Sequence, residues 1–541
     1  MTGGLFIDNS SRSVSVGEKR LKWPVWLALA LAATIATTGY ICLRGAALFN
    51  PGYGVLDRLL AVCLLLAEGF LFVHALGYFL STIRAAKGYQ VVSGRAFIAT
   101  AQPHVAVAIT SYNEDPAILE ETLISATNMN YPNKTVYIAD DSTDEKIRQE
   151  IQRLAARLGC VYVHREKRSG YKAGNLNHLI RRLPEKYLAV FDADQKPVNT
   201  FLSEIIPLLE ENPKLAFVQT PQFYANTDKN PVAFAAGQQQ AVFYEVVCEG
   251  KNLNDALFSA GSNVVYRLEA LRDISGFDEV SITEDFATSL KLHLRGWSSL
   301  YYNHVFVYGL GPESLSGYFT QQMRWALGTL GVLRRVIASL LRAPRALKPQ
   351  QWWEYFLSGS YYLIGWVYFV LMLCPLAFLL FNIKPLIMNP AYYAAAFTPH
   401  LIISTGTFFA GMAARGYKPK SLFLGQILTF NAFWILMNAA VLALFNVRRP
   451  FSVTPKGVSG RVSLKYLLPH LVLLALSVAA LGSGVYRLAV AFDPAIIVNI
   501  VWASYHIFLL SMVFYFNRSF ESYQPKPLFR RLSLKETSLT H

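Results

Sequence analysis

Long apolar runs flank a central stretch of ordinary polarity in this chain of 541 residues. A helix that crosses a membrane needs about 20 mostly apolar residues. Six runs reach that length with few charges: Trp23–Leu43, Leu59–Thr82, Phe356–Phe381, Tyr392–Met412, Tyr466–Tyr486 and Ala495–Phe516. The pattern predicts a multi-pass membrane protein in which a soluble domain separates the second and third spans.

A seventh apolar run, Leu422–Asn446, precedes the most basic short loop of the chain. That loop contains Arg448, Arg449, Lys456, Arg461 and Lys465. Basic loops beside membrane helices stay on the cytoplasmic side, and a crossing by residues 422–446 would place these charges outside. We therefore expect this run to lie at the interface, or to enter the membrane without crossing it. Six spans then place both termini and the soluble domain on the cytoplasmic side of the inner membrane.

Short apolar runs alternate with amphipathic stretches between residues 100 and 311. Strands are expected at His104–Thr110, Thr135–Ala139, Cys160–His164 and Leu188–Phe191. Helices are expected at Pro116–Asn128, Asp144–Leu158 and Ala173–Arg182. This alternation predicts an α/β domain with a parallel, doubly wound sheet, inserted between the transmembrane helices. In such a sheet the ligand binds beyond the carboxyl ends of the strands.

The chain divides into five parts on this basis. Residues 1–99 hold an N-terminal tail and two transmembrane helices, and residues 100–311 form the soluble domain. Residues 312–355 form interfacial helices. Residues 356–517 hold four transmembrane helices, the interfacial run 422–446 and a loop at 447–462, and residues 518–541 form a cytoplasmic tail.

Composition narrows the possible functions. The net charge of +15 would suit a nucleic-acid partner, but the positive residues neither gather on one face nor alternate with aromatic residues. We therefore expect no nucleic-acid partner. No GxGxxG or GxxxxGK[ST] motif follows a predicted strand, which argues against a dinucleotide or P-loop site. Glu68 and His74 lie inside the second span, where ionisable groups are often functional; pairing within the helix bundle is the favoured interpretation.

Charged side chains gather where the predicted strands end. Asp140 and Asp141 follow the second strand, and Asp192 and Asp194 follow the fourth, with Lys172 between them in the chain. Two carboxylates at i and i+2 on a loop can offer hard oxygen ligands to Mg²⁺ or Mn²⁺, which also binds diphosphate oxygens. The D-x-D pattern is common at turns without function, but its position directly after an apolar strand favours a metal site.

Two later groups add candidate chemistry. Thr283-Glu284-Asp285 precedes a helical stretch, Phe286–Leu294. Gln321, Arg324 and Trp325 have the spacing i, i+3, i+4, which places them on one face of a helix. An indole can stack on a sugar ring, and a guanidinium can pair with a diphosphate. The alternative is an amphipathic helix that rests on the membrane.

Together these motifs resemble the processive family 2 glycosyltransferases, the group of cellulose, chitin and hyaluronan synthases, and most closely the catalytic subunit of bacterial cellulose synthase. The ordered set is Asp140-Asp141, Asp192-Ala193-Asp194, Thr283-Glu284-Asp285 and Gln321-Gln322-Met323-Arg324-Trp325. In addition, Phe451–Gly457 resembles the gating loop of that enzyme. The resemblance implies a GT-A-like fold. Gln195 stands where cellulose synthases usually carry His, and Ser259–Ser262 replaces their Phe-Cys-Gly stretch.

The resemblance also implies residue roles. Tyr112, Glu114, Asp140 and Asp141 would hold the uridine, and Lys172 the diphosphate. Asp192 and Asp194 would bind the metal, and Asp192 would also belong to the donor site. Asp285 would be the general base, and Gln321, Arg324 and Trp325 would hold the acceptor end and the diphosphate. The gating loop would cover the donor through Phe451, Val453, Thr454 and Lys456.

By the same resemblance, the chain would be an inverting, processive hexosyltransferase. It would elongate a β-linked polysaccharide, with a glucan favoured, from a UDP-sugar, with UDP-glucose favoured, and move the polymer across the membrane. Its partners would be the growing glycan, the lipid bilayer and envelope export subunits. One alternative is the transfer of a single sugar onto a membrane lipid. Another is a channel or inactive binding protein that kept the fold, but none of the catalytic carboxylates is missing.

Overall fold

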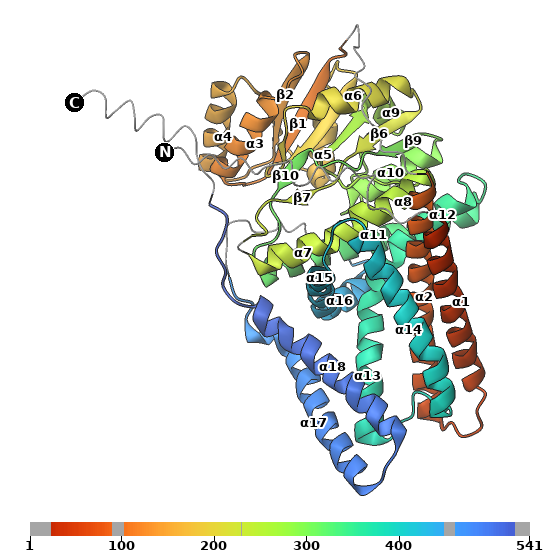
Figure 1. Cartoon of the computed structure of the whole chain (residues 1–541). Helices are drawn as coiled ribbons and strands as arrows, with labels where there is room; N and C mark the ends of the chain where they lie inside the picture. The colour runs from red at the N-terminus through yellow and green to blue at the C-terminus, as the bar shows by residue number, and fades with distance from the viewer. Residues whose placement is uncertain (1–22, 89–101, 229, 448–459, 525–541) are drawn as a thin grey trace.

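The computed structural model describes residues 23–88, 102–228, 230–447 and 460–524. The proposed gating-loop residues Phe451, Val453, Thr454 and Lys456 lie outside these ranges. A domain built on a β-sheet sits on one end of a bundle of long helices (Figure 1). The chain enters through two helices of the bundle, builds the domain, and then returns to the bundle.

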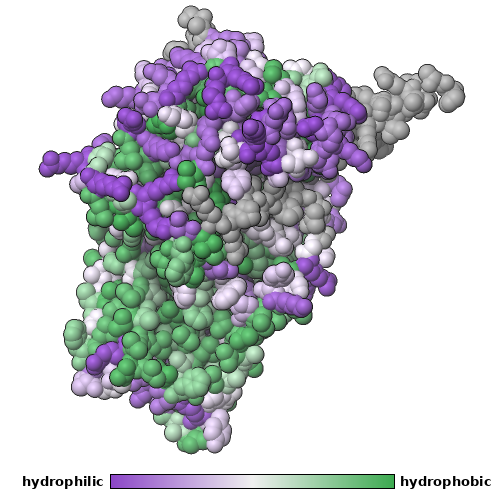
Figure 2. Space-filling model, turned by 180° about the vertical axis from the view of Figure 1, so that it is seen from behind, coloured by the Kyte–Doolittle hydropathy of each residue, from purple (hydrophilic) through white to green (hydrophobic). Residues whose placement is uncertain are grey.

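Within the described ranges, five helical segments are long and apolar enough to cross a membrane, by length and composition. They are α1 (Trp23–Ala47), α2 (Val55–Gly88), α12 to α13 (Pro349–Ser360 and Ile364–Phe381), α17 (Leu468–Val490) with the short turn before it, and α18 (Pro494–Phe516). Apolar residues cover the sides of this bundle, whereas hydrophilic residues cover the domain above it (Figure 2). This surface fits the expected division into a membrane part and a soluble part.

The expected span at Tyr392–Met412 is the exception. It forms a continuous helix, α14 (Pro390–Ala413), but this helix is not among the segments that reach the apolarity of the others. Its sequence includes Pro399, His400 and several Ser and Thr residues. The helix packs along α1, where the His400 ring lies 2.9 Å from the Thr37 hydroxyl. Its polar groups therefore face a neighbouring helix, which lowers the cost of placing them in a bundle.

The run 422–446 forms two helices, α15 (Pro419–Asn431) and α16 (Phe433–Leu444), with a bend of 49° between them. They lie at the end of the bundle that carries the domain (Figure 1). There α15 packs on α7 (Pro231–Val242), and α16 packs on α11 (Leu315–Arg342). Taken together, the two helices are long and apolar enough to form a broken span or a re-entrant segment, so the expectation that they do not cross the membrane, like the orientation of the chain, stays a prediction.

The ionisable side chains of α2, Glu68 and His74, form hydrogen bonds within the bundle, as predicted from the sequence. The Glu68 carboxylate accepts hydrogen bonds from Tyr40 at 2.6 Å and from Arg44 at 2.8 Å. The His74 ring lies within 3.0 Å of the Phe70 carbonyl. Such pairing within a bundle compensates for the desolvation of these groups.

The main sheet has seven strands in the order β3-β2-β1-β4-β8-β6-β9. Its first half is parallel, as predicted, and consists of β3 (Val161–His164), β2 (Lys134–Asp140), β1 (Val105–Ser111) and β4 (Tyr187–Asp192). The second half consists of β8 (Val264–Arg267), β6 (Leu215–Gln219) and β9 (Ser298–Tyr301). In that half β8 runs antiparallel to both of its neighbours.

The sheet is therefore mixed: the four strands predicted from the sequence pair in parallel, and β8, which was not predicted, introduces the antiparallel pairs. The chain enters β8 at the edge where β4 ends, since the Asn263 amide donates to the Val190 carbonyl at 2.9 Å. A strand that enters at the carboxyl edge of its neighbour must run in the opposite direction. As a result, the loop before β8, residues 259–263, lies beside the end of β4.

Helices cover both faces of the sheet. Val105, Val107 and Ile109 of β1 pack with α3 (Pro116–Thr127) and α6 (Phe201–Glu211) on one face. Ala106 and Ala108 pack on the other face with α5 (Tyr171–Ile180). Burial on both faces explains why the strand is a continuous apolar run. Asp115 caps α3 and Asp144 caps α4 (Glu145–Arg157), so both predicted helices begin at polar residues that satisfy their first N–H groups.

A small second sheet lies next to the carboxyl edge of the main one. It pairs β5 (Lys196–Pro197), β10 (Val307–Gly309) and β7 (Phe223–Tyr224). The remaining domain helices are η2 (Phe243–Val247), α8 (Cys248–Leu253), α9 (Leu268–Asp273) and α10 (Glu284–Leu294). Because β5 begins two residues after Asp194, this sheet fixes the chain that leaves the D-x-D loop.

Candidate active site

A cavity of about 420 Å³ opens between the carboxyl edge of the main sheet and helix α11. The predicted site residues in the described part of the chain line it, with the exception of Asp140. They are Tyr112, Glu114, Asp141, Lys172, Asp192, Asp194, Asp285, Gln321, Arg324 and Trp325. Segments that are more than 200 residues apart in the chain therefore meet in one cavity.

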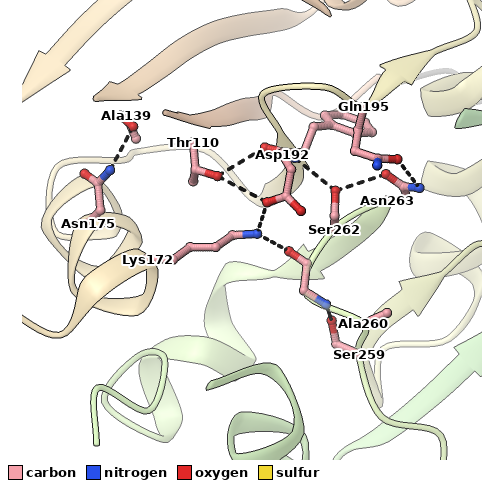
Figure 3. A network of polar contacts seen from close by, with 12 residues as sticks. Thr110, Ala139, Lys172, Asn175, Asp192, Gln195, Ser259, Ala260, Ser262 and Asn263 are labelled. Atoms are coloured by element: carbon pink, nitrogen blue, oxygen red, sulfur yellow. Dashed lines mark hydrogen bonds and ion pairs between the residues drawn. The ribbon is translucent and has the colours of Figure 1, made fainter. Parts of the chain in front are cut away.

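Asp192 is the last residue of β4, and its carboxylate pairs with the Lys172 ammonium (Figure 3). Lys172 also donates to the Gly261 carbonyl at 2.7 Å, and the Asp192 amide donates to the Ser262 hydroxyl at 3.0 Å. Burial alone would lower the pKa of Lys172, but the charge of Asp192 raises it above its ordinary value. Lys172 is thus a fixed positive charge at the centre of the cavity.

Asp194 lies on the loop after β4 and is 5% exposed. Its carboxylate accepts a hydrogen bond from the Leu310 amide at 3.3 Å, which ties this loop to the chain after β10. Asp192 and Asp194 offer oxygen ligands only, which suits a hard divalent cation that takes its other ligands from a diphosphate. No cluster of three or more His, Cys, Asp or Glu side chains that could hold a metal by itself occurs in the described ranges. The residues present therefore fit a cation that binds together with a substrate.

Asp140 and Asp141 differ in position, although they are adjacent in the chain. Asp140 is fully buried behind the cavity, and its carboxylate accepts from the Ser142 amide and hydroxyl and from the Tyr162 hydroxyl. Asp141 lines the cavity and forms two hydrogen bonds with the Arg165 guanidinium, at 2.8 and 2.7 Å. Only Asp141 is placed to touch a ligand, and Asp140 supports the loop from behind.

Tyr112 lies at the end of β1, on the same side of the cavity as Asp141. The Arg168 guanidinium stacks over its ring at 4.3 Å from the centroid. A flat ring at the mouth of the cavity can stack on a nucleobase. Two other groups lining the cavity, Ser111 and Asn175, each have a buried oxygen that forms no hydrogen bond within the described residues.

Glu284 and Asp285 form the first turn of α10 and face Lys172 across the cavity. Asp285 accepts a hydrogen bond from the Phe286 amide at 2.8 Å. Burial raises the pKa of both carboxyls, and for Glu284 the neighbouring Asp285 raises it further. Glu284 belongs to the predicted Thr-Glu-Asp motif, but no role was predicted for it.

Gly261 allows the loop before β8 to approach Asp285. A Cβ atom at this glycine would lie 3.0 Å from an Asp285 carboxylate oxygen, and its φ of +79° is strained for other residues. The Ser259–Ser262 stretch noted in the sequence therefore forms the wall between Asp285 and Asp192.

Gln195, the residue directly after the D-x-D motif, is 5% exposed and supports the loop of residues 259–263 through a hydrogen bond with Asn263. Its side-chain oxygen accepts a hydrogen bond from the Asn263 amide group at 3.1 Å (Figure 3). Asn263 has a φ of +59°, a conformation that Asn tolerates better than most residues. The substitution of Gln for His at this position is thus matched by a partner at Asn263.

Helix α11 brings the last predicted group to the cavity. Gln321, Arg324 and Trp325 face the cavity, whereas Gln322 between them is 1% exposed and buried away from it. The Gln321 amide donates to the Tyr224 hydroxyl at 3.5 Å. Tyr224 was not predicted, because nothing in its short strand distinguishes it from a core aromatic residue. The Arg324 guanidinium, the Trp325 indole, and the side chains of Gln321 and Tyr224 therefore lie opposite Asp192 and Asp194 in the cavity.

Comparisons with protein families agree with the motifs. Residues 103–328 match the family described as glycosyltransferase like family 2, and residues 274–410 match the cellulose synthase family. The first match covers the mixed sheet and the start of α11, and it confirms the expected GT-A-like fold. The second match continues into the bundle.

Individual proteins point the same way. The chain is 30% identical over 424 residues to the cellulose synthase catalytic subunit of Pseudomonas fluorescens, covering 76% of this chain and 56% of that protein. It is 30% identical over 393 residues to cellulose synthase 2 of Novacetimonas hansenii, covering 71% of this chain and 24% of that protein. The chain thus spans about half or less of the length of these relatives.

A solved mannosyltransferase of Pyrobaculum calidifontis, in complex with GDP-Man and Mn²⁺, is 19% identical with a TM-score of 0.46. That comparison covers 73% of this chain and 100% of that one. The family matches and the curated relatives, taken with the site, lead to one conclusion. Residues 103–410 are similar in sequence to family 2 glycosyltransferases and to cellulose synthases.

Proposed function

We propose that this chain is an inverting membrane glycosyltransferase that elongates a β-linked polysaccharide, with a glucan favoured, from a UDP-sugar. The observation that carries the proposal is that Asp141, Asp192, Asp285 and the Gln321–Trp325 face line one cavity. These groups come from the sheet edge, from α10 and from the helix that joins the domain to the bundle. A donor held by the sheet and an acceptor held by α11 would meet at Asp285.

The donor half of the cavity would be formed by the sheet. Tyr112 would stack on the uracil, while Glu114 and Asp141 would accept hydrogen bonds from the uridine. Lys172 would pair with the diphosphate. Asp192 and Asp194 would hold Mg²⁺ or Mn²⁺, which would neutralise charge on the departing nucleoside diphosphate.

Asp285 would take the proton from the acceptor hydroxyl as that oxygen attacks the anomeric carbon. A raised pKa suits a general base, because a proton acceptor is most effective when its pKa is near the working pH. Arg324 would stabilise the negative charge that develops on the leaving group. One displacement breaks the bond to the diphosphate and inverts the anomeric carbon, so an α-linked donor gives a β-linked product.

The acceptor half would be formed by Gln321 and Trp325, with the indole stacked on the terminal sugar of the glycan. The position of α11 on top of the bundle supports a polymer that enters the membrane as it grows. Residues 451–457 would cover the donor, and both termini and the domain would be cytoplasmic. Envelope export subunits would receive the polymer.

Donor competition tests the proposal. Membranes that contain the full chain are supplied with labelled UDP-glucose and Mg²⁺ or Mn²⁺, and unlabelled nucleotide sugars are added in turn. We expect incorporation into polymer that UDP-sugars inhibit and that excess chelator abolishes. No incorporation from labelled UDP-sugars, together with incorporation when a labelled guanosine or cytidine diphosphate sugar is supplied instead, would refute the UDP-sugar assignment.

A further inference from the structure

The segment that follows α18 is bound to the domain by hydrogen bonds. Residues Asn517–Tyr523, which we call the strap, rise from the end of α18 along the outside of the molecule to the edge of the domain (Figure 1, dark blue). The strap has no regular secondary structure between residues 519 and 523. Its position must therefore come from side-chain and backbone contacts.

The strap is fixed at its start to the chain before α17. The Asn517 side chain accepts a hydrogen bond from the Val462 amide at 2.7 Å and donates to the Val462 carbonyl at 2.9 Å. One amide side chain thus satisfies both polar groups of a backbone residue.

The far end of the strap binds the chain beside the D-x-D loop. The Tyr523 hydroxyl donates to Glu121 of α3 at 2.6 Å and accepts from the Lys196 ammonium at 3.0 Å. The Lys196 ammonium also lies 4.9 Å from the centre of the Tyr523 ring and 3.0 Å from Glu121. Lys196 is only two residues beyond Asp194, so this triad holds the exit of the loop that would bind the metal.

The same tyrosine also binds the entrance of α11. Its backbone amide donates to the Glu313 carboxylate at 2.5 Å. Glu313 is 4% exposed and directly precedes Ser314, the N-cap of α11. Asn230, before α7, donates to the carbonyls of both Glu313 and Glu521, at 2.8 and 3.4 Å.

We propose that Tyr523 is a positioning residue, which fixes the Asp192–Asp194 loop relative to the start of α11 through Lys196 and Glu313. The inference rests on the proposed function, since it concerns the distance between the donor half and the acceptor half of that cavity. A shift of about 1 Å between reacting groups can lower the rate about a hundredfold. The contacts of Tyr523 with Lys196 and Glu313 would therefore affect the rate of sugar transfer.

The test uses the full chain in lipid nanodiscs. Tyr523→Ala removes the hydroxyl and the ring, and we expect kcat to fall about tenfold or more. The affinity for UDP, measured without a divalent cation, should change less than about twofold, because the groups that would bind the uridine follow β1 and β2 and Lys172 lies on α5. Tyr523→Phe keeps the ring over Lys196 but removes the hydroxyl that bonds Glu121 and Lys196, so it should recover only part of the rate.

A matched control lies in the same segment. The Ser522 hydroxyl is buried and makes no hydrogen bond in the described residues, so Ser522→Ala should leave kcat unchanged. If Tyr523→Ala does not fold, kcat is measured instead for Tyr523→Phe, for Lys196→Met and for the variant that carries both changes. We expect the effects of the two single changes on kcat to be non-additive, because both break the same contact. Wild-type kcat in Tyr523→Ala, or additive effects in the pair, would overturn the proposal, whereas an inactive wild-type protein would instead refute the proposed function.

Discussion

Two pairs of adjacent acidic residues lie on opposite sides of the same cavity, and their surroundings differ. Asp140 and Asp141 are surrounded by donors, since each accepts at least two hydrogen bonds and Asp141 pairs with Arg165. Asp285 accepts one backbone hydrogen bond, from Phe286, and burial raises the pKa of both Glu284 and Asp285. The first pair is held in place by its hydrogen-bond partners, whereas burial raises the proton affinity of the second.

The comparison teaches that the residue type alone does not set the role of a carboxylate. Donors that saturate a carboxylate keep it charged and fix its position. A carboxylate that is desolvated with few donors gains proton affinity, which is what a general base requires. Four predictions follow from this difference, in order of expected effect.

Asp285→Asn should have the largest effect on turnover. An amide keeps the size of the side chain but does not accept a proton at neutral pH, and general-base catalysis contributes typically about 10²–10⁴-fold. We expect kcat to fall by that factor while the affinity for UDP, measured by calorimetry, is unchanged. An Asp285→Asn variant with the activity of the wild type would show that Asp285 is not the general base.

Asp141→Asn should act mainly on stability. The Asp141 and Arg165 side chains are 7% and 6% exposed, and breaking a buried pair by removing one charge costs roughly 3–5 kcal/mol. A lower Tm and weaker UDP binding are expected. Asp285→Asn is the control, because it removes a desolvated charge with few donors and should not lower Tm. Equal Tm values for the two variants would contradict the distinction.

The pH dependence of kcat should report the second pair. Burial raises the pKa of Asp285 to about 6, and the base must be ionised to accept a proton. As the pH falls through this value the ionised fraction decreases, so kcat should drop about tenfold per pH unit on the acid side. A rate that stays constant down to pH 4 would show that no group with a raised pKa limits transfer.

Tyr162→Phe should have the smallest effect. It removes one hydrogen bond to Asp140, at 2.9 Å, and a hydrogen bond to a charged group contributes about 1.5–3 kcal/mol to stability. The Ser142 contacts to Asp140 remain, so we expect a loss at the low end of that range, with kcat unchanged. A tenfold loss of kcat would instead place Asp140 in the reaction.

Much of this arrangement could be predicted from the sequence. The strands β1 to β4 and the helices between them were predicted within a few residues, because they are continuous apolar runs bounded by capping residues such as Asp115 and Asp144. The motifs of residues 192–194 and 283–285 meet in the cavity because the first ends a strand and the second begins a helix at the same edge, and residues 321–325 face them from within α11.

Other features depend on tertiary contacts. The short strand β8 runs antiparallel because of where residues 259–263 enter the sheet, and no local pattern gives that direction. Asp140, the last residue of β2, faces away from the cavity that Asp141 lines, because side chains of successive residues in an extended chain point to opposite faces. The partners of Tyr523 come from residues about 210 to 400 positions away and have no local signal.

Analysis of the product tests the central claim most directly. Purified full chain in nanodiscs is incubated with labelled UDP-glucose and a divalent cation, with Asp285→Asn as the control. Chain length is measured by gel filtration, and linkage by digestion with β-specific and α-specific glucanases. The account predicts a long polymer that only the β-specific enzymes degrade, and no polymer from Asp285→Asn. A single labelled sugar on lipid, or an α-linked product, would contradict it.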